Sequence, residues 1–168
     1  MPRSTNRPAR RMIALALLAA VAGGCGRSED VRPRTLRRAE QTWEQANIKN
    51  YELEWTASGP QTGRRGAHYR VRVRDGKVQS VEAIRPDGQF VAVNTKRPEY
   101  FGVDGLFRTI EEEMAQLDTD KPFGQPKGTR VVLQFTPDEK LGFPRSYRRD
   151  VMNVPQGVAI DVVKFEAK

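Results

Sequence analysis

The chain has 168 residues, with 29 Lys or Arg against 21 Asp or Glu and a formal net charge of +8. Its only cysteine is Cys25 and its only histidine is His68, so one chain can form neither an internal disulfide nor a metal site built on several histidines. Four arginines lie in the first 11 residues. Without residues 1–24 the net charge falls to about +4, which weakens the case for nucleic-acid binding.

The first 24 residues have the pattern of a secretory signal peptide. A segment rich in arginine precedes 11 consecutive uncharged residues, from Met12 to Ala22. A helix that crosses a bilayer needs about 20 apolar residues, so this run is too short for a permanent membrane span. We therefore predict that residues 1–24 direct export and are then removed.

The residues around Cys25 resemble the lipobox of bacterial lipoproteins, because small residues precede the cysteine in Ala22-Gly23-Gly24-Cys25. We expect Cys25 to carry a lipid that holds the chain at a membrane outside the cytoplasm, and residues 25–34 to form a flexible tether. Gly26 stands where an aspartate would retain a lipoprotein at the inner membrane. This favours the periplasmic side of the outer membrane if the source has two membranes. The alternative is an ordinary secretory peptide followed by a free cysteine.

Residues 35–168 are expected to form a single domain that begins with a helix and a strand. Thr35 is a candidate N-cap for a helix whose apolar residues recur at spacings of three and four, namely Leu36, Ala39, Trp43 and Ala46. From Tyr51 the period changes to two, with apolar side chains at residues 51, 53 and 55. This alternation is typical of a strand.

A β-hairpin is the clearest local signal in the sequence. After a predicted loop over 59–66, apolar and polar residues alternate over 67–74, and Asp75-Gly76 offers the two positive-φ positions of a type I′ turn. With regular pairing the return strand would turn Glu82 to the apolar face. We therefore predict a β-bulge near Gln79 or Ser80 that turns Val81 and Ala83 inward.

The second half of the domain is predicted to add one helix and three or four strands. Residues 86–88 read as a turn, and residues 89–94 could form a short strand. Asp104 is a candidate N-cap for a helix over 105–117 that keeps Glu111, Glu112 and Glu113 mostly in solvent. Strands follow over 131–135, 145–152 and 158–165. The order of elements predicts an α+β fold, a two-layer antiparallel β-sheet of about five to seven strands with two helices packed on one face.

Several short motifs follow one another over residues 40 to 166. They are an Asn-Tyr strand start after a Trp and an Ile, the Val-x-Val-x-Asp-Gly-x-Val hairpin, the helix after Val103-Asp104, and the turn Gly142-Phe143-Pro144 followed by Asp150. In this order they resemble the domain of unknown function 6174 family, a family of small exported or lipidated bacterial domains. The resemblance implies an exported α+β module and brings no established activity. Many members carry a cysteine pair after the first strand, and the loop over 59–66 has none.

The sequence predicts no catalytic residue, no metal ligand and no cofactor site. His68 lies on the polar side of its strand beside Arg70, and the side chains of Glu111 to Glu113 point about 100° apart on a helix and cannot converge on one ion. Neither a phosphate-binding loop nor a nucleophile elbow occurs. Whether the chain is an enzyme stays open, although a non-enzymatic role is favoured.

The remaining evidence for binding is a group of basic residues. Arg70, Arg72 and Arg74 share one strand face and are candidates for contact with an anionic lipid or a cell-wall polymer. The surface could also include Arg64 and Arg65 just upstream and, if the strands are neighbours, Arg145, Arg148 and Arg149 on the return strand. The alternative is a sheet face that arginines keep soluble. Aromatic residues between the arginines point inward, which disfavours nucleic acid.

We therefore hypothesise a membrane-anchored lipoprotein that acts as a non-enzymatic binding or envelope-accessory module. An envelope hydrolase without a recognisable motif is the alternative. The oligomeric state cannot be predicted.

Overall fold

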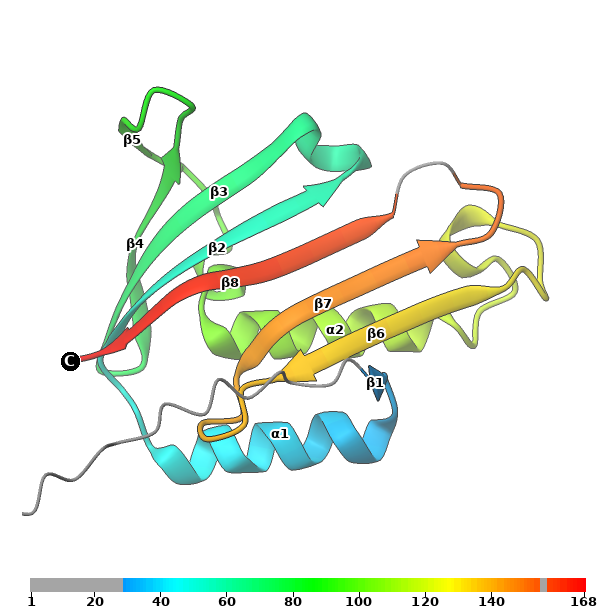
Figure 1. The fold of residues 1–168 in the computed structure, drawn as a ribbon, viewed down its shortest axis with the longest axis horizontal. Helices are drawn as coiled ribbons and strands as arrows, with labels where there is room; N and C mark the ends of the chain where they lie inside the picture. The colour runs from blue at the N-terminus through cyan, green and yellow to red at the C-terminus, as the bar shows by residue number, and fades with distance from the viewer. Residues whose placement is uncertain (1–28, 155–156) are drawn as a thin grey trace, which may run out of the picture.

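One antiparallel sheet runs through the whole domain and carries both helices on the same face (Figure 1). The computed structural model describes residues 29–154 and 157–168, so the predictions for the signal peptide and Cys25 lie outside the described residues. In the described part, no helix has the length and apolar character needed to cross a membrane.

The α+β fold class predicted from the sequence is confirmed. The helices are α1 (Pro33–Ala46) and α2 (Val103–Gln116). The strands are β1 (Glu29–Asp30), β2 (Tyr51–Gly59), β3 (Gly63–Arg74), β4 (Lys77–Ile84), β5 (Phe90–Ala92), β6 (Val131–Pro137), β7 (Pro144–Val151) and β8 (Val158–Ala167). Their order in the sheet is β1-β6-β7-β8-β2-β3-β4-β5, so two very short strands, β1 and β5, lie at its edges and bring the number of strands in the described part of the chain to eight.

The segment predicted as a tether is partly folded. Glu29 and Asp30 pair with Phe135 and Gln134 of β6, and α1 begins at Pro33. Residues 29–34 therefore belong to the domain, and only residues 25–28 of the predicted tether precede it. A two-residue strand has too few positions to show any periodicity, which is why the sequence did not reveal it.

The start of α1 also differs from the prediction. Arg32 is the N-cap and Pro33 takes the first helical position, where its missing N–H leaves no bond unmade. Thr35 is the third residue of the helix. Its hydroxyl accepts a hydrogen bond from the backbone N–H of Arg32 at 3.1 Å, so it stabilises the helix start from inside the first turn.

The β3–β4 hairpin forms as predicted. Asp75 and Gly76 have φ of 50° and 71°, as a type I′ turn requires. Arg72 pairs with Ser80 and Val73 with Val78, which leaves Gln79 as the extra residue of a β-bulge. Because of this bulge Val81 turns to the core, where it is buried. The predicted loop over 59–66 is shorter than expected, because β3 already begins at Gly63.

Helix α2 starts at Val103, with Gly102 as its N-cap. Asp104 is not the cap. Its carboxylate accepts a hydrogen bond from the indole Nε1 of Trp43 at 2.8 Å and so joins the two helices. Leu117, the last residue of the predicted helix, follows the end of α2 and is 41% exposed.

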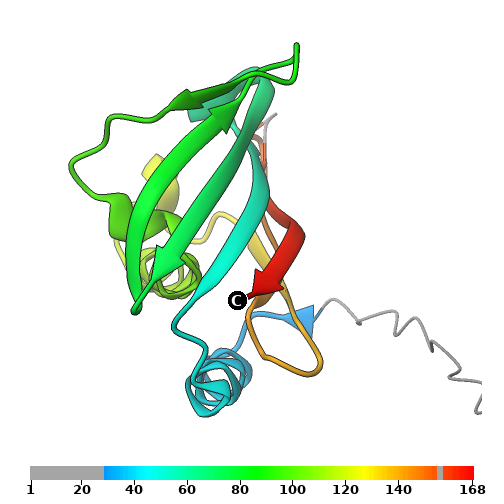
Figure 2. The same cartoon turned by 90° about the vertical axis from the view of Figure 1, so that its left-hand side faces the viewer.

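The core lies between the sheet and the two helices (Figure 2). Aromatic side chains fill one end of it: Tyr51 and Phe165 both contact Trp43, with ring centroids 5.5 and 5.8 Å from it. One of these rings also has a polar group that forms a hydrogen bond. The hydroxyl of Tyr51 accepts a hydrogen bond from the backbone N–H of Val103 at 3.0 Å, which fixes the start of α2 on the sheet.

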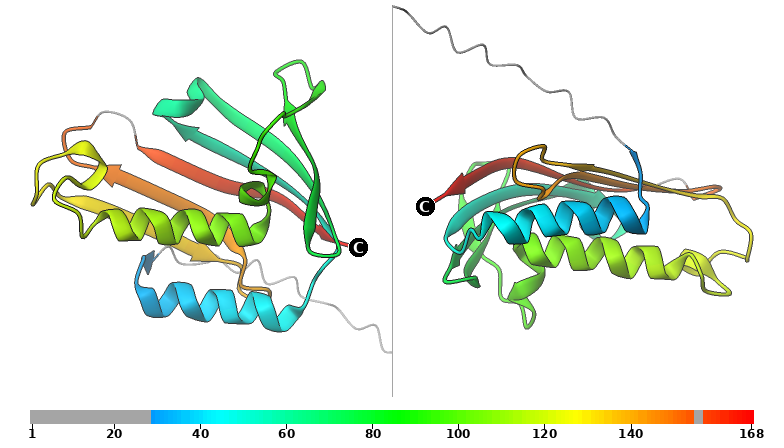
Figure 3. Two further views of the ribbon diagram at one scale, coloured as in Figure 1. Left: turned by 180° about the vertical axis from the view of Figure 1, so that it is seen from behind. Right: turned by 90° about the horizontal axis from the view of Figure 1, so that it is seen from below.

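Strands β7 and β8 pair over only part of their length. β7 pairs with residues 158–161 of β8, whereas β2 accompanies β8 from Ala159 to Ala167. Opposite Glu54 and Trp55 the register shifts, so that Val163 is an extra residue of β8. A bulge bends its strand, and the two strands diverge beyond this point (Figure 3).

Candidate functional site

The three arginines identified from the sequence lie together on the face of the sheet that carries no helix. Val71 and Val73 are buried against the helices, and Arg70, Arg72 and Arg74 alternate with them along β3. A strand points successive side chains to opposite faces, so the arginines share the outer face. The sequence placed these residues correctly relative to one another.

Two glutamates of the neighbouring strand pair with all three arginines. Nη2 of Arg70 lies 2.7 Å from Oε1 of Glu54. Glu52 forms ion pairs with the other two arginines. Its Oε1 lies 3.6 Å from Nε of Arg72 and 3.5 Å from Nη2 of Arg74. These carboxylates come from β2, which pairs with β3 residue by residue from Tyr51 to Ala57. The arginine surface is therefore a ladder of ion pairs, and its positive charge is largely compensated.

The ladder of charges continues across β8 and β7. Arg148 of β7 donates two hydrogen bonds of 2.8 Å to the carboxylate of Asp161 on β8. Lys164 and Lys168 lie 2.9 and 3.0 Å from the two carboxylate oxygens of Glu166. β7 is separated from β3 by two strands, so Arg148 does not extend the surface made by Arg70, Arg72 and Arg74.

His68 lies on the outer face, next to Glu54. Its Nε2 is 3.6 Å from Oε2 of Glu54, and its side chain is 35% exposed. That nitrogen has no hydrogen-bond partner among the described residues. Because the same glutamate also binds Arg70, His68 forms part of the charged ladder.

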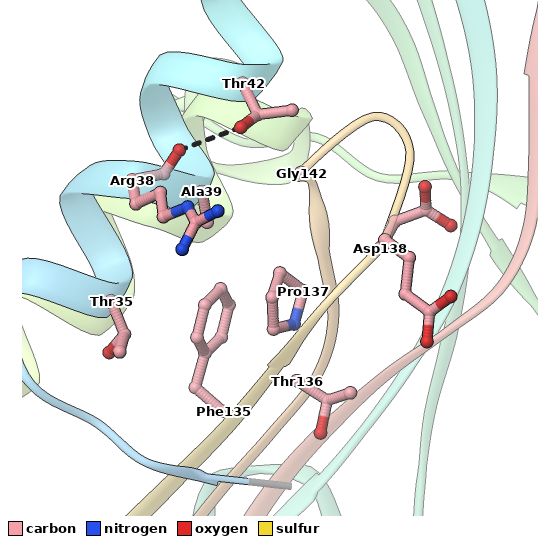
Figure 4. Close-up of a pocket in the computed structure, with 10 residues that line it drawn as sticks. Thr35, Arg38, Ala39, Thr42, Phe135, Thr136, Pro137, Asp138 and Gly142 are labelled. Atoms are coloured by element: carbon pink, nitrogen blue, oxygen red, sulfur yellow. Dashed lines mark hydrogen bonds between the residues drawn. The ribbon is translucent and has the colours of Figure 1, made fainter. Parts of the chain in front are cut away.

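A pocket of about 340 Å³ opens between α1 and the end of β6 (Figure 4). The side chains of Phe135 and Pro137 point from the strand toward the helix, and Arg38 and Thr42 line the helical side. Asp138 stands at the rim, where its carboxylate accepts hydrogen bonds from the backbone N–H groups of residues 140 and 141 and so closes the β6–β7 turn. The walls are mainly apolar.

A second cleft, of about 420 Å³, lies where α1, α2 and the start of β2 meet, and it is acidic. Four acidic side chains line it beside two basic ones, namely Glu40, Glu44, Asp104 and Glu111 with Lys49 and Arg108. Burial raises the pKa of the Glu40 carboxyl, and the negative charges of Glu111, Glu44 and Asp104 raise it further. Within the described ranges, no three His, Cys, Asp or Glu side chains are placed so that they could hold a metal ion.

One charged cluster on the inner face was missed by the sequence analysis. Glu113 of α2 accepts a hydrogen bond of 2.5 Å from the hydroxyl of Tyr147 and one of 2.6 Å from Arg149. The guanidinium of Arg149 also lies over the ring of Phe123, 4.3 Å from its centroid. Burial and the Glu113 carboxylate both raise the pKa of Tyr147, so its hydroxyl stays protonated and donates the hydrogen bond to Glu113. The cluster ties the end of α2 to the sheet.

These observations define a class of protein: a small two-layer α+β domain whose helix-free sheet face carries paired charges. The chain belongs to the family described as "Family of unknown function (DUF6174)", whose profile matches residues 35–153. The match spans α1 to β7, so β8 lies outside it although it occupies the middle of the sheet. No curated protein matches the chain.

Proposed function

We propose that the chain is a lipid-anchored protein of the bacterial cell envelope, with Cys25 as the lipidated residue, and that its domain is a binding or accessory module. The signal-peptide pattern of residues 1–24 and the small residues before Cys25 support the anchor. The observation that carries the binding role is the open outer face. Its charged side chains are displayed on a broad sheet surface and pair with one another.

We further propose that Arg70, Arg72 and Arg74 contact an anionic polymer or an anionic lipid headgroup. The side chains are 32%, 50% and 36% exposed, so a ligand can reach them. An anion must compete with Glu52 and Glu54 for the same guanidinium groups. The pairs of Arg72 and Arg74 with Glu52 are the more exposed ones, and exposed ion pairs contribute about 1 kcal/mol or less, so an anion can replace Glu52 there. The resulting binding is weak and sensitive to salt.

The anchor is tested by metabolic labelling with a clickable fatty acid. The wild-type chain should be labelled and Cys25→Ser should not, because only a thiol accepts the diacylglyceryl group. Ser28→Ala, close to the same site, should keep the label. Equal labelling of wild type and Cys25→Ser, or none in either, would remove the claim.

The arginine surface is tested with vesicles and cell-wall fragments. In the triple variant Arg70→Gln, Arg72→Gln, Arg74→Gln, binding to anionic vesicles or wall fragments should fall to the level seen with neutral vesicles. Wild-type binding should weaken between 0.1 M and 1 M salt, where the Debye length shrinks from about 10 Å to about 3 Å.

A matched control carries the same change of charge elsewhere. Lys121, Lys127 and Arg130 are exposed and lie outside the sheet, so replacing all three by Gln should leave binding nearly unchanged. If both triple variants lose binding equally, net charge rather than this surface is responsible. If neither loses it, the arginines serve solubility alone.

A further inference from the structure

The open side of β8 lies inside the sheet, where strands are normally paired on both sides. Beyond Asp161, β8 keeps β2 as its neighbour but has no strand partner on its other side among the described residues. β7 cannot continue the pairing, because it begins at Pro144, which has no N–H, and the chain before it turns toward α1 (Figure 1). The segment from Val162 to Ala167 therefore presents a free strand edge.

The direction of its backbone groups follows from one hydrogen bond. The N–H of Lys168 donates to the carbonyl of Asn50 at 2.9 Å, on the side of β2. Since N–H and C=O groups of alternate residues point to the same side of a strand, Glu166 also faces β2. The backbone groups of Phe165 and Ala167 then face away from β2, into the open side.

A groove of about 490 Å³ runs along this edge. Its wall on β8 is formed by residues 162–165, and its other wall comes from the turn between β6 and β7, including Leu141 and Phe143. Phe143 stacks on Phe165 at 4.7 Å between centroids, which gives the groove an apolar floor. Val163, pushed outward by the bulge, is 56% exposed.

The rim of the groove is basic. Lys140, Arg145 and Lys164 line it from the two sides, and all three are exposed. The one carboxylate that lines it, Asp138, accepts hydrogen bonds within its own turn. Lys164 also pairs with Glu166, and the remaining two cations have no ion-pair partner among the described residues.

We propose that this groove binds an extended segment of a partner protein, which adds to the free edge of β8 as an antiparallel or parallel strand and carries acidic side chains beside an apolar one. The free backbone groups of Phe165 and Ala167 supply N–H donors and C=O acceptors at the spacing of a peptide strand. The basic rim selects acidic side chains, and Val163 with the apolar floor receives the apolar one. The inference rests on the proposed role as a binding module and names the class of partner for it.

The experiment uses the chain from Gly26 to Lys168, which contains every described element. The probe is a short fluorescein-labelled peptide in which Glu and Val alternate, titrated by fluorescence anisotropy. The two control probes replace Glu by Lys, or methylate alternate backbone nitrogens. The Glu-Val peptide should bind saturably, and both controls should bind at least about tenfold more weakly.

Protein variants locate the site. The triple variant Lys140→Glu, Arg145→Glu, Lys164→Glu should lose at least about tenfold in affinity, whereas Lys121→Glu, Lys127→Glu, Arg130→Glu, with the same change of charge, should bind as the wild type. Hydrogen exchange adds a direct readout: the amides of Phe165 and Ala167 should become protected by the peptide. Melting temperatures of both variants show that the fold is kept.

Three outcomes would overturn the proposal: no saturable binding, equal binding of the methylated peptide, or protection at other amides only. In each case the lysines at this edge prevent pairing with strands of other chains, a common role of charged residues at sheet edges. The assay contains no lipid. A failure of the Cys25 labelling would therefore leave this result intact, and a failure here would leave the anchor intact.

Discussion

Among individual residues, Arg149 and Glu113 depart most from what their positions in the sequence suggest. Glu113 is the last of three consecutive glutamates on a helix, a pattern typical of a solvated face, yet its side chain is only 18% exposed. Arg149 lies on the inner face of β7, where an apolar residue would be the usual choice, and its side chain is 15% exposed. Each compensates the buried charge of the other, and neither could be predicted without the packing of α2 on β7.

Arg149→Met is expected to lower the free energy of unfolding by about 2 kcal/mol, because it leaves the carboxylate of Glu113 shielded from water without its cation. Arg148→Met is the matched control. It removes an ion pair from the next residue of the same strand, but the side chains of Arg148 and Asp161 are 40% and 39% exposed, so the cost should stay below about 1 kcal/mol. Urea denaturation of both variants measures the difference, and equal costs would contradict this account.

For the candidate site, the positions of the arginines could be predicted from the sequence, but their ion pairs could not. Strand periodicity placed Arg70, Arg72 and Arg74 on one face, because that alternation is local. The ion pairs with Glu52 and Glu54 depend on the register between β2 and β3, which is set by the short connection over Pro60–Thr62. A longer loop, over residues 59–66, was predicted there, so the glutamates were not aligned with the arginines.

At the scale of elements, turn chemistry was the most reliable guide. The β3–β4 hairpin and its bulge followed from Asp75-Gly76 and from the need to keep Glu82 off the apolar face. Helix starts were less predictable. Thr35 and Asp104 both have good capping chemistry, but Pro33 begins α1 earlier, and Asp104 is bound to Trp43 of the other helix.

The contact between α1 and the β6–β7 turn depends on Gly142. Its φ is +78°, and a Cβ at this position would lie 2.3 Å from the carbonyl oxygen of Ala39. Gly142→Ala should therefore combine backbone strain with a clash against the helix. Gly88 has nearly the same φ, +81°, with no atom within 4 Å of the Cβ position, so Gly88→Ala reports the strain alone.

We expect Gly88→Ala to cost about 1 kcal/mol and Gly142→Ala at least ~2 kcal/mol more, because the clashing atom belongs to helix backbone and cannot move aside. Thermal unfolding of the two variants gives the comparison. Similar melting temperatures would mean that α1 does not press on this turn as closely as described.

For the molecule as a whole, the sequence predicted the layers but not the order of strands. Alternation and hairpin turns identify consecutive neighbours such as β3 and β4 and the pair β6 and β7. β8, the last strand, inserts between β7 and β2 and so joins the two halves of the sheet. This pairing connects residues more than a hundred positions apart, and no local pattern reveals it. The groove beside β8 was unpredictable for the same reason.

The pairing of β1 with β6 has a consequence for how the domain stands at a membrane. Only residues 26–28 separate Cys25 from β1, and four steps of extended chain reach at most roughly 14 Å. With the lipid on Cys25 as proposed, the β1 edge of the sheet stays close to the headgroups. The β3 arginines lie five strand spacings away from it, roughly 24 Å, well beyond the screening length of about 8 Å in physiological salt.

A domain standing on its β1 edge thus holds the β3 arginines clear of the leaflet that anchors it, and they face sideways into the surrounding compartment. Contact between these arginines and the membrane of the anchor would require the sheet to lie flat with both helices turned outward. In an upright domain the short link therefore favours binding of the β3 arginines to material above the membrane, such as wall polymer, over binding to the lipid around the anchor.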